Sequence, residues 1–284
     1  MPRKELEIAR DYLILIKPKV IWLLIMAALV GYLYASLPHF SWAKLAELAA
    51  VGLLTTGGSA AFNMYWERDI DAKMGRTSNR PLPAGRIKPG LALAYSIAMS
   101  AAGLALAWAW LGAPAACAAA AGWAFYAVVY TIALKRRHWS NILLGGFAGN
   151  AAFLSGWLAS RPLTLEAVLA SFAVWLWIPA HIWSLAYVYR EEYREAGVPM
   201  LTALLPEGSA VALTAALNAA SAAYMLAFLA VYRDWINAAV FAPAAAVAIY
   251  LGLRAVAERS EGAFWRVFKA SSPLLAVFFI ALLL

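Results

Sequence analysis

Long apolar segments alternate with short polar ones along almost the whole chain. Nine apolar segments stand out, at residues 18–37, 44–66, 91–111, 113–133, 140–160, 163–188, 208–231, 235–253 and 264–284. A helix of about 20 apolar residues crosses the ~30 Å hydrocarbon core of a bilayer. Lipid cannot hydrogen-bond backbone groups, and the segments lack the period-two alternation of barrel strands, so we expect helices. The pattern predicts an all-α, polytopic membrane helix bundle with nine transmembrane helices.

The distribution of charge gives this bundle an orientation. Only 13% of the 284 residues are charged. Eighteen Lys and Arg residues lie around the start of the first span or after spans two, four, six and eight; the other connections hold three, Lys44, Arg161 and Arg233. The positive-inside rule then predicts a multi-pass protein of the cell membrane, with its N-terminus and longer polar loops in the cytoplasm. The net charge of +8 follows from this topology and gives no support for nucleic-acid binding.

The spacing of the polar loops indicates an internal organisation. Two long acidic loops, after the second and sixth spans, lie about 120 residues apart. This spacing favours a single domain, residues 1–284, built from two four-helix halves at about 18–133 and 140–253, with the ninth span outside the repeat. Two unrelated charged loops are the alternative. We expect no cleavable signal, because the charged N-terminus leads into a full-length span. The single cysteine, Cys117, excludes an internal disulfide.

The first acidic loop carries the most specific pattern in the chain. Residues 63–90 read NMYWERDIDAKMGRTSNRPLPAGRIKPG, with three acids and six bases. If the second span continues as a helix, Asn63, Glu67 and Asp71 share one face, and Asp69 points elsewhere. Carboxylate and amide oxygens suit Mg²⁺, which commonly shares its coordination with substrate phosphates. We interpret these three residues as metal ligands; a solvated helix end is the alternative.

Basic residues follow the acids directly. Arg76, Arg80 and Arg86 lie within the same loop, and guanidinium groups bind phosphate oxygens in a forked geometry. Metal and arginine together would neutralise a departing diphosphate. A second basic group, Lys135, Arg136 and Arg137, follows the fourth span. It suits phosphate or carboxylate, although anionic lipid headgroups would explain it equally well.

The second acidic loop is preceded by a histidine within the membrane. An ionisable residue at that depth is by default a functional candidate, although a structural histidine is the alternative for His181. Eleven residues later Glu192 returns to nearly the same helical face, with Glu191 and Glu195 beside it. The loop therefore predicts a second polar wall for the site.

These motifs resemble a known family. NMYWERDIDAKMGRTSNRPLPAG is similar to the first aspartate-rich motif of the UbiA-type intramembrane prenyltransferases, specifically of the protohaem IX farnesyltransferases (haem O synthases). The likeness continues in YLILIKPKVIWL, YTIALKRRHWSNILLGGFAGNAAFLSGW and WIPAHIWSLAYVYREEYREAGVPML, so it covers most of residues 11–205. It implies a UbiA-like fold of nine helices around a central cavity, with Mg²⁺ and prenyl diphosphate held between two acidic motifs.

The resemblance also implies roles for single residues. The metal ligands would be Asn63, Glu67, Asp71 and Glu192, and these four with His181 would form the catalytic set. Glu67 and Glu192 stand where the family usually has aspartate. The implied substrate-binding residues are Arg76, Arg80, Lys135, Arg136, Arg137, Glu191 and Glu195.

The reaction implied is a Mg²⁺-dependent transfer of a farnesyl or longer prenyl group from its diphosphate to the vinyl group of haem b, giving a haem O-type product. Two alternatives remain open. The acceptor could be another molecule, such as an aromatic acid, a quinone precursor or glycerol phosphate. The chain could instead be a transporter, although charges near the bilayer midplane would then be expected.

Overall fold

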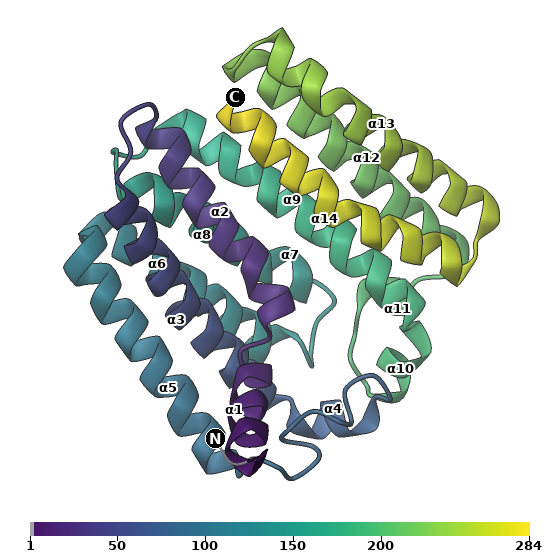
Figure 1. The fold of residues 1–284 in the computed structure, drawn as a ribbon. Helices are drawn as coiled ribbons and strands as arrows, with labels where there is room; N and C mark the ends of the chain where they lie inside the picture. The colour runs from purple at the N-terminus through teal and green to yellow at the C-terminus, as the bar shows by residue number, and fades with distance from the viewer. Residues whose placement is uncertain (1–2) are drawn as a thin grey trace. The chain divides into compact units, whose positions relative to one another are not determined.

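The computed structural model describes residues 3–284, and every regular element in that range is a helix (Figure 1). The predicted all-α class is therefore confirmed. The chain forms two compact units. Unit 1 contains the residues up to Ala133 together with Ala151–Pro162, and unit 2 contains Leu134–Asn150 and Leu163–Leu284.

Unit 1 holds the N-terminal helices. They are α1 (Arg3–Leu15), α2 (Pro18–Ser36), α3 (Trp42–Trp66), the short α4 (Arg68–Lys73), α5 (Pro89–Leu106), α6 (Ala113–Ala124) and the second part of α8 (Phe147–Leu158). Two of them continue in wider π-helical turns, α5 over Ala107–Leu111 and α6 over Phe125–Leu134. The helix starts follow from local chemistry, because proline begins α2 and α5 and the Ser41 hydroxyl caps α3.

Small residues let the helices of unit 1 approach one another closely. A Cβ atom added to Gly156 of α8 would lie 1.8 Å from the Ala28 carbonyl oxygen of α2, and one added to Gly31 would lie 2.2 Å from the Phe153 oxygen. Between α3 and α5, Gly58 meets Ser100 and Gly103 meets Thr55 in the same way. Because apolar side chains gain little by leaving lipid, such backbone contact is a main source of packing energy in a membrane. It fixes α3, which leads into the polar segment.

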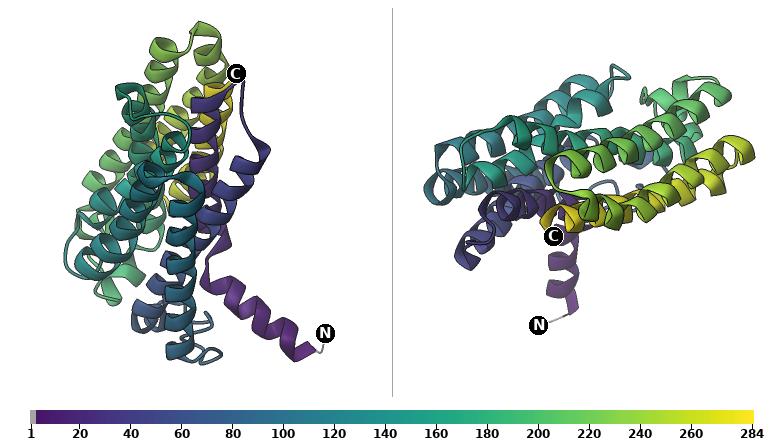
Figure 2. Two further views of the ribbon diagram at one scale, coloured as in Figure 1. Left: turned by 90° about the vertical axis from the view of Figure 1, so that its left-hand side faces the viewer. Right: turned by 90° about the horizontal axis from the view of Figure 1, so that it is seen from above.

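Unit 2 is built on four long helices, each of which packs mainly against two of the others. Helix α9 (Leu165–Val188) packs against α12 (Glu207–Tyr232) and α14 (Glu261–Leu283), and α13 (Trp235–Glu258) packs against α12 and α14. The short helices α7 (Asn141–Gly145), α10 (Arg190–Glu195) and α11 (Leu201–Leu204) complete the unit, and Figure 2 shows its long helices from two further directions. The caps at Thr164, Asp234 and Ser260 each accept the backbone N–H three residues on.

One of the nine predicted spans is interrupted in the structure. Within residues 3–284, eight helices are long and apolar enough to cross a membrane. They correspond to eight of the predicted segments, and the exception is 140–160, which forms α7 and α8 instead.

The interruption of the fifth segment has a local cause. It occurs at Gly146, beside Gly145, and adjacent glycines favour a helix weakly. The Trp175 indole N–H donates to the Leu143 carbonyl oxygen at 2.8 Å, and a Cβ at Gly146 would lie 3.2 Å from the Trp175 ring. The side chain of α9 therefore occupies the position at which the helix breaks. The predicted repeat of two four-helix halves stays a prediction.

Candidate active site

The candidate site of unit 1 forms where the long helix α3 gives way to α4. Helix α3 ends at Trp66, and Glu67 leaves helical geometry with φ −98° and ψ 11°. Two backbone hydrogen bonds nevertheless bridge the break, from Glu67 N–H to the Asn63 oxygen (3.0 Å) and from Asp71 N–H to the Glu67 oxygen (2.8 Å). The four-residue register therefore continues from α3 into α4.

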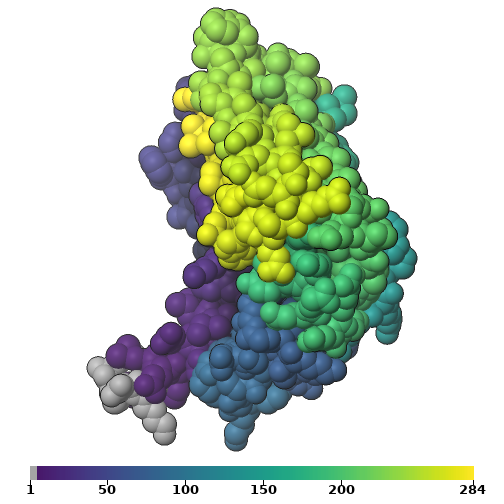
Figure 3. Space-filling model, turned by 90° about the vertical axis from the view of Figure 1, so that its right-hand side faces the viewer, coloured from purple at the N-terminus to yellow at the C-terminus, as the bar shows by residue number. Residues whose placement is uncertain are grey.

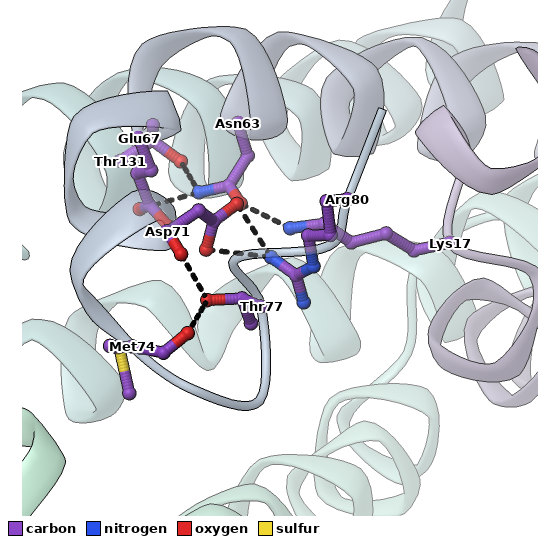
Figure 4. Close-up of polar contacts among 8 residues, drawn as sticks. All are labelled: Lys17, Asn63, Glu67, Asp71, Met74, Thr77, Arg80 and Thr131. Atoms are coloured by element: carbon purple, nitrogen blue, oxygen red, sulfur yellow. Dashed lines mark hydrogen bonds and ion pairs between the residues drawn. The ribbon is translucent and has the colours of Figure 1, made fainter. Parts of the chain in front are cut away.

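This register brings the three predicted metal ligands to one buried face. The exposed fractions of Asn63, Glu67 and Asp71 are 1%, 2% and 4%, whereas Asp69 is exposed. Figure 4 shows the three side chains turned toward one another. Two buried carboxylates so close in sequence require cationic or hydrogen-bonding partners, since an uncompensated buried charge is strongly unfavourable.

The Asn63 side chain links three elements. Its amide nitrogen donates to Glu67 Oε1 at 2.7 Å and to Thr131 Oγ1 at 2.9 Å, and its Oδ1 accepts the Lys17 ammonium. Thr131 donates its own proton to the Tyr126 carbonyl oxygen, so its oxygen is free to accept. The donors and acceptors around Asn63 thus determine which way its amide points.

Asp71 is held by an arginine and by its own loop. Both carboxylate oxygens accept from Arg80 Nη1, at 2.8 and 2.7 Å. The Thr77 hydroxyl, which is buried, donates to the Asp71 carbonyl oxygen at 2.9 Å. The loop after α4 therefore folds back onto α4 and brings a guanidinium group to the acidic face (Figure 4).

Lys17 reaches the site through an unusual backbone conformation. It lies between α1 and α2, directly before Pro18, with φ 51° and ψ 61°. A left-handed conformation is unfavourable for a residue with a side chain and is disfavoured further before proline. Strain of this kind persists only where surrounding structure enforces it and is concentrated at functional sites.

The donor set fits a magnesium ion shared with a substrate. Across residues 3–284, no three His, Cys, Asp or Glu side chains gather into a metal site by themselves. Mg²⁺ is commonly bound through one or two carboxylates, with water and substrate phosphate completing its shell. Two buried carboxylates and one amide oxygen, with Arg80 and Lys17 beside them, meet that requirement for a diphosphate complex.

The other predicted basic residues lie in the loop after α4 and at the start of unit 2. Arg76 is exposed in the loop after α4. Arg86 does not face the acidic cluster: its Nε donates to both oxygens of Asp11 in α1, at 3.1 and 3.0 Å. In unit 2, Lys135 is half-buried and Arg136 and Arg137 are exposed in the turn that begins the unit. The phosphate-binding role of these residues stays a prediction.

His181 lies in α9 of unit 2 and is tied to α14. Its ring stacks between Trp177 and Phe268, with centroid separations of 4.5 and 4.4 Å. Its Nδ1 lies 2.6 Å from the Ser271 hydroxyl, which donates its only proton to the Phe268 carbonyl oxygen. Ser271 must therefore accept from His181, so the hydrogen bonds assign the proton to Nδ1 and leave Nε2 as the acceptor in the neutral ring.

The second acidic segment follows the helix that carries His181 after a single non-helical residue. Helix α9 ends at Val188, Tyr189 has φ −105° and ψ 26°, and α10 begins at Arg190. Two backbone hydrogen bonds bridge this break as they do at Glu67, from Tyr189 N–H to the Leu185 oxygen (3.2 Å) and from Tyr193 N–H to the Tyr189 oxygen (3.1 Å). The placement of Glu192 on nearly the same face as His181 stays a prediction.

The three glutamates of α10 have different surroundings. Glu191 pairs with Arg194 at 2.7 Å, and Glu195 is exposed. Glu192 Oε2 is buried, and it has no hydrogen-bond partner among the described residues. An unpaired buried carboxylate oxygen fits a metal ligand, but the roles of Glu191, Glu192 and Glu195, and a cavity shared by both acidic segments, stay predictions.

Three contributors to these sites were not predicted. Lys17 and Thr131 bond Asn63 from 46 and 68 residues away, and Ser271 bonds His181 from 90 residues away. Two of these three residues lie in motifs that already stood out in the sequence. Lys17 stands in the motif IKPK before a proline, and Thr131 lies in the motif YTIALKRR. Ser271 carries no comparable signal, since serine is common in membrane helices.

Comparisons with known proteins agree with this architecture. The sequence model of the UbiA prenyltransferase family matches residues 24–283. The chain is 54% identical over 273 residues to the protoheme IX farnesyltransferase of Pyrobaculum neutrophilum, covering 95% of this chain and 98% of that protein.

Two solved structures are similar in fold. One is a UbiA homologue from Aeropyrum pernix, with a TM-score of 0.73 and 26% identity over 92% of this chain and 97% of that one. The other is a UbiA homologue from Archaeoglobus fulgidus bound to GPP and Mg²⁺, with a TM-score of 0.71 and 18% identity over 96% of this chain and all of that one.

Proposed function

This chain belongs to the UbiA prenyltransferase family, and we propose that it transfers a farnesyl group from farnesyl diphosphate to the vinyl group of haem b. The observation that carries the proposal is the 54% identity with a protoheme IX farnesyltransferase over nearly the whole of both chains. The site of unit 1 supports the donor half of the reaction, because it combines buried carboxylates with basic side chains.

The donor half uses the residues around the end of α3. Glu67, Asp71 and the Asn63 amide oxygen are the proposed ligands for Mg²⁺, with Glu192 as the proposed ligand from the second acidic segment. Mg²⁺ has been found with a prenyl diphosphate in the similar Archaeoglobus structure. When bound, the ion neutralises charge that develops on the departing diphosphate.

Arginine and lysine side chains supply the remaining positive charge. Arg80 already lies at the acidic face, where it pairs with Asp71. Lys17 is held there through Asn63. Charge-assisted hydrogen bonds from these groups to phosphate oxygens would orient the diphosphate and stabilise it as a leaving group. Arg76, Lys135, Arg136 and Arg137 are the further proposed phosphate contacts.

The proposed chemistry breaks the bond to diphosphate, the π bond of the vinyl group and one O–H bond of water, and it forms a carbon–carbon and a carbon–oxygen bond. The bond between the first carbon of the farnesyl group and the diphosphate oxygen breaks, and the electron pair leaves with diphosphate. The vinyl group of haem b attacks the allylic cation and forms the new carbon–carbon bond. Water then adds to the cation left on the haem side chain and releases a proton, which gives a hydroxyalkyl product.

The acceptor half is supported by unit 2. His181 is the proposed contact with haem b, since its Nδ1 is engaged by Ser271 and its Nε2 is the ring nitrogen that can accept or ligate. Glu191 and Glu195, both in the second acidic segment, are the further proposed substrate contacts.

One assay tests the assignment. Purified protein in lipid nanodiscs is incubated with Mg²⁺, haem b and farnesyl diphosphate, and the haem fraction is analysed by mass spectrometry. We expect haem b increased in mass by one farnesyl group and one hydroxyl group. Omission of Mg²⁺ or addition of a chelator should abolish the product.

A control separates the acceptor from the donor half of the reaction. Release of diphosphate is followed in the same preparation. The donor is changed to geranylgeranyl diphosphate, and the acceptor is changed to an aromatic acid, a quinone precursor or glycerol phosphate. A prenylated product with any of these, and none with haem b, would overturn the haem assignment while leaving a prenyltransferase. Absence of product with every acceptor in a folded preparation would overturn both.

A further inference from the structure

Helix α1 has an amphipathic pattern that the proposed reaction does not explain. Its sequence is RKELEIARDYLIL. Leu6, Ala9 and Leu13 recur at i, i+3 and i+7, so they lie on one stripe of the helix. Glu7 and Asp11 lie four residues apart on the opposite side. A helix with one apolar and one charged face requires two different environments.

One side of α1 is attached to the rest of unit 1. The Tyr12 ring packs edge-on against Tyr95 of α5, with centroids 5.1 Å apart, and Leu15 is completely buried. Asp11 pairs with Arg86 of the loop before α5. These contacts lie in the second half of the helix and fix its direction.

The stripe on the other side is exposed within unit 1. Leu6 and Leu13 are 56% and 55% exposed, and Ala9 is exposed as well. In Figure 3 the purple side chains of α1 project beside the blue segment that follows α4. Two large aliphatic side chains and an alanine in one stripe would be unfavourable in water, at roughly 25 cal/mol per Å² of apolar surface.

The connection to α2 determines where this stripe lies. Helix α1 ends at Leu15 and the membrane-spanning helix α2 begins at Pro18, so only two residues separate them. The left-handed conformation of Lys17 turns the chain sharply between the two, and Figure 2 shows α1 inclined to α2. A helix that ends two residues before a span, and is inclined to that span, is held near the membrane surface.

We propose that α1 is an interfacial helix, and that Leu6, Ala9 and Leu13 insert into the boundary between the headgroups and acyl chains of the bilayer. The partner is the lipid leaflet itself. Insertion of one face of an amphipathic helix to ~5–10 Å is the known depth for such elements. Arg10 of α1 and Lys19 in the first turn of α2 are both exposed and suit anionic headgroups.

Site-specific labelling of the full chain tests this placement. Cys117 is exposed and is the only cysteine, so a Cys117→Ala variant gives a clean background. Leu6→Cys, Leu13→Cys and the matched polar-face variant Glu7→Cys are labelled with an environment-sensitive fluorophore. Each protein is reconstituted into nanodiscs of phosphatidylcholine and phosphatidylglycerol, and quenching is measured with aqueous iodide and with lipids that carry a nitroxide in the headgroup or at the chain end.

The proposal predicts opposite behaviour of the two faces. Labels at positions 6 and 13 should emit at shorter wavelength than the label at position 7 and should be quenched several-fold more by headgroup nitroxide than by iodide. The label at position 7 should respond mainly to iodide.

Three results would overturn the proposal. Equal iodide quenching at all three positions would mean that α1 stands in water. Strongest quenching by the chain-end nitroxide would mean that α1 extends the span into the bilayer. Shielding of positions 6 and 13 in native membranes but not in pure lipid nanodiscs would mean that the stripe docks a protein.

Discussion

At the scale of single residues, the site depends on which acidic side chains face inward. Asn63, Glu67 and Asp71 are buried, while Asp69, two residues from Asp71, is exposed. The charge is the same in Asp69 and Asp71, but Asp71 is buried and paired with Arg80, whereas Asp69 is exposed. This pair provides a matched test of the proposed metal site.

The Asp71→Asn variant should lose turnover, because an amide cannot supply the anionic oxygen that the proposed ion needs. We expect kcat to fall about 100-fold or more, the order found when one electrostatic contact to a transition state is removed. The Asp69→Asn variant should stay within about twofold of the parent, as exposed substitutions usually do.

Turnover is measured by product mass, and binding of Mn²⁺ in place of Mg²⁺ is measured in the presence of farnesyl diphosphate. A folded Asp71→Asn protein that binds Mn²⁺ and turns over like the parent would remove Asp71 from the site. Equal losses in the two variants would show a general effect of negative charge.

The residues of the acidic face could be predicted from the sequence, whereas two of their hydrogen-bond partners could not. The i, i+4, i+8 spacing was sufficient for Asn63, Glu67 and Asp71, because two backbone hydrogen bonds carry the register across the break at Glu67. Lys17 and Thr131 could not be predicted in the same way. Their contact with Asn63 depends on how α2 and the π-helical turns pack beside α3, and spacing along the chain contains no information on that.

At the scale of elements, apolarity predicted where helices lie better than where they break. Eight of the nine predicted segments are long helices. The exception is the fifth segment, which is interrupted at Gly146, where a glycine pair meets the Trp175 side chain of another helix. The length of the apolar run was correct, but the break depends on a contact between segments.

Glycine at close helix contacts should be sensitive to substitution by alanine. In Gly156→Ala the new Cβ would lie 1.8 Å from the Ala28 backbone oxygen, so α2 and α8 must separate. We expect destabilisation of about 1–3 kcal/mol, the usual range for overpacking. The matched control is Gly90→Ala in α5, where no atom lies within 4 Å of the added Cβ.

The stability of both variants is compared with that of the parent by the midpoint of thermal unfolding in nanodiscs. Gly90→Ala should equal or slightly exceed the parent, since alanine favours a helix more than glycine does. An unfolding midpoint of Gly156→Ala that matches that of Gly90→Ala would contradict the close packing of α2 against α8.

At the scale of the whole molecule, membrane crossing is evident but its direction is a prediction. The asymmetry of Lys and Arg predicts a cytoplasmic N-terminus and cytoplasmic acidic segments. In the Cys117→Ala background, cysteines at Ser78 and at Glu195 should react with a membrane-impermeant maleimide only from the cytoplasmic side. A cysteine at Ser41, before α3, should react only from the other side.

Labelling of intact cells tests exposure at the outer face, and labelling of inverted vesicles tests exposure at the cytoplasmic face. Reaction of position 78 or position 195 from the outer face of intact cells would contradict the predicted orientation. A reaction of these two positions from opposite faces would also contradict a site that draws on both acidic segments.

The order of synthesis has a consequence for unit 1, which is discontinuous in sequence. Its last piece, Ala151–Pro162, follows Leu134–Asn150, which belongs to unit 2. Chains generally fold from the N-terminus while the ribosome is still translating. The face of α2 that carries Ala28 and Gly31 therefore waits for α8 until translation has passed residue 158. A nascent chain that stops before this point leaves that small-residue face open to lipid or to the insertion machinery.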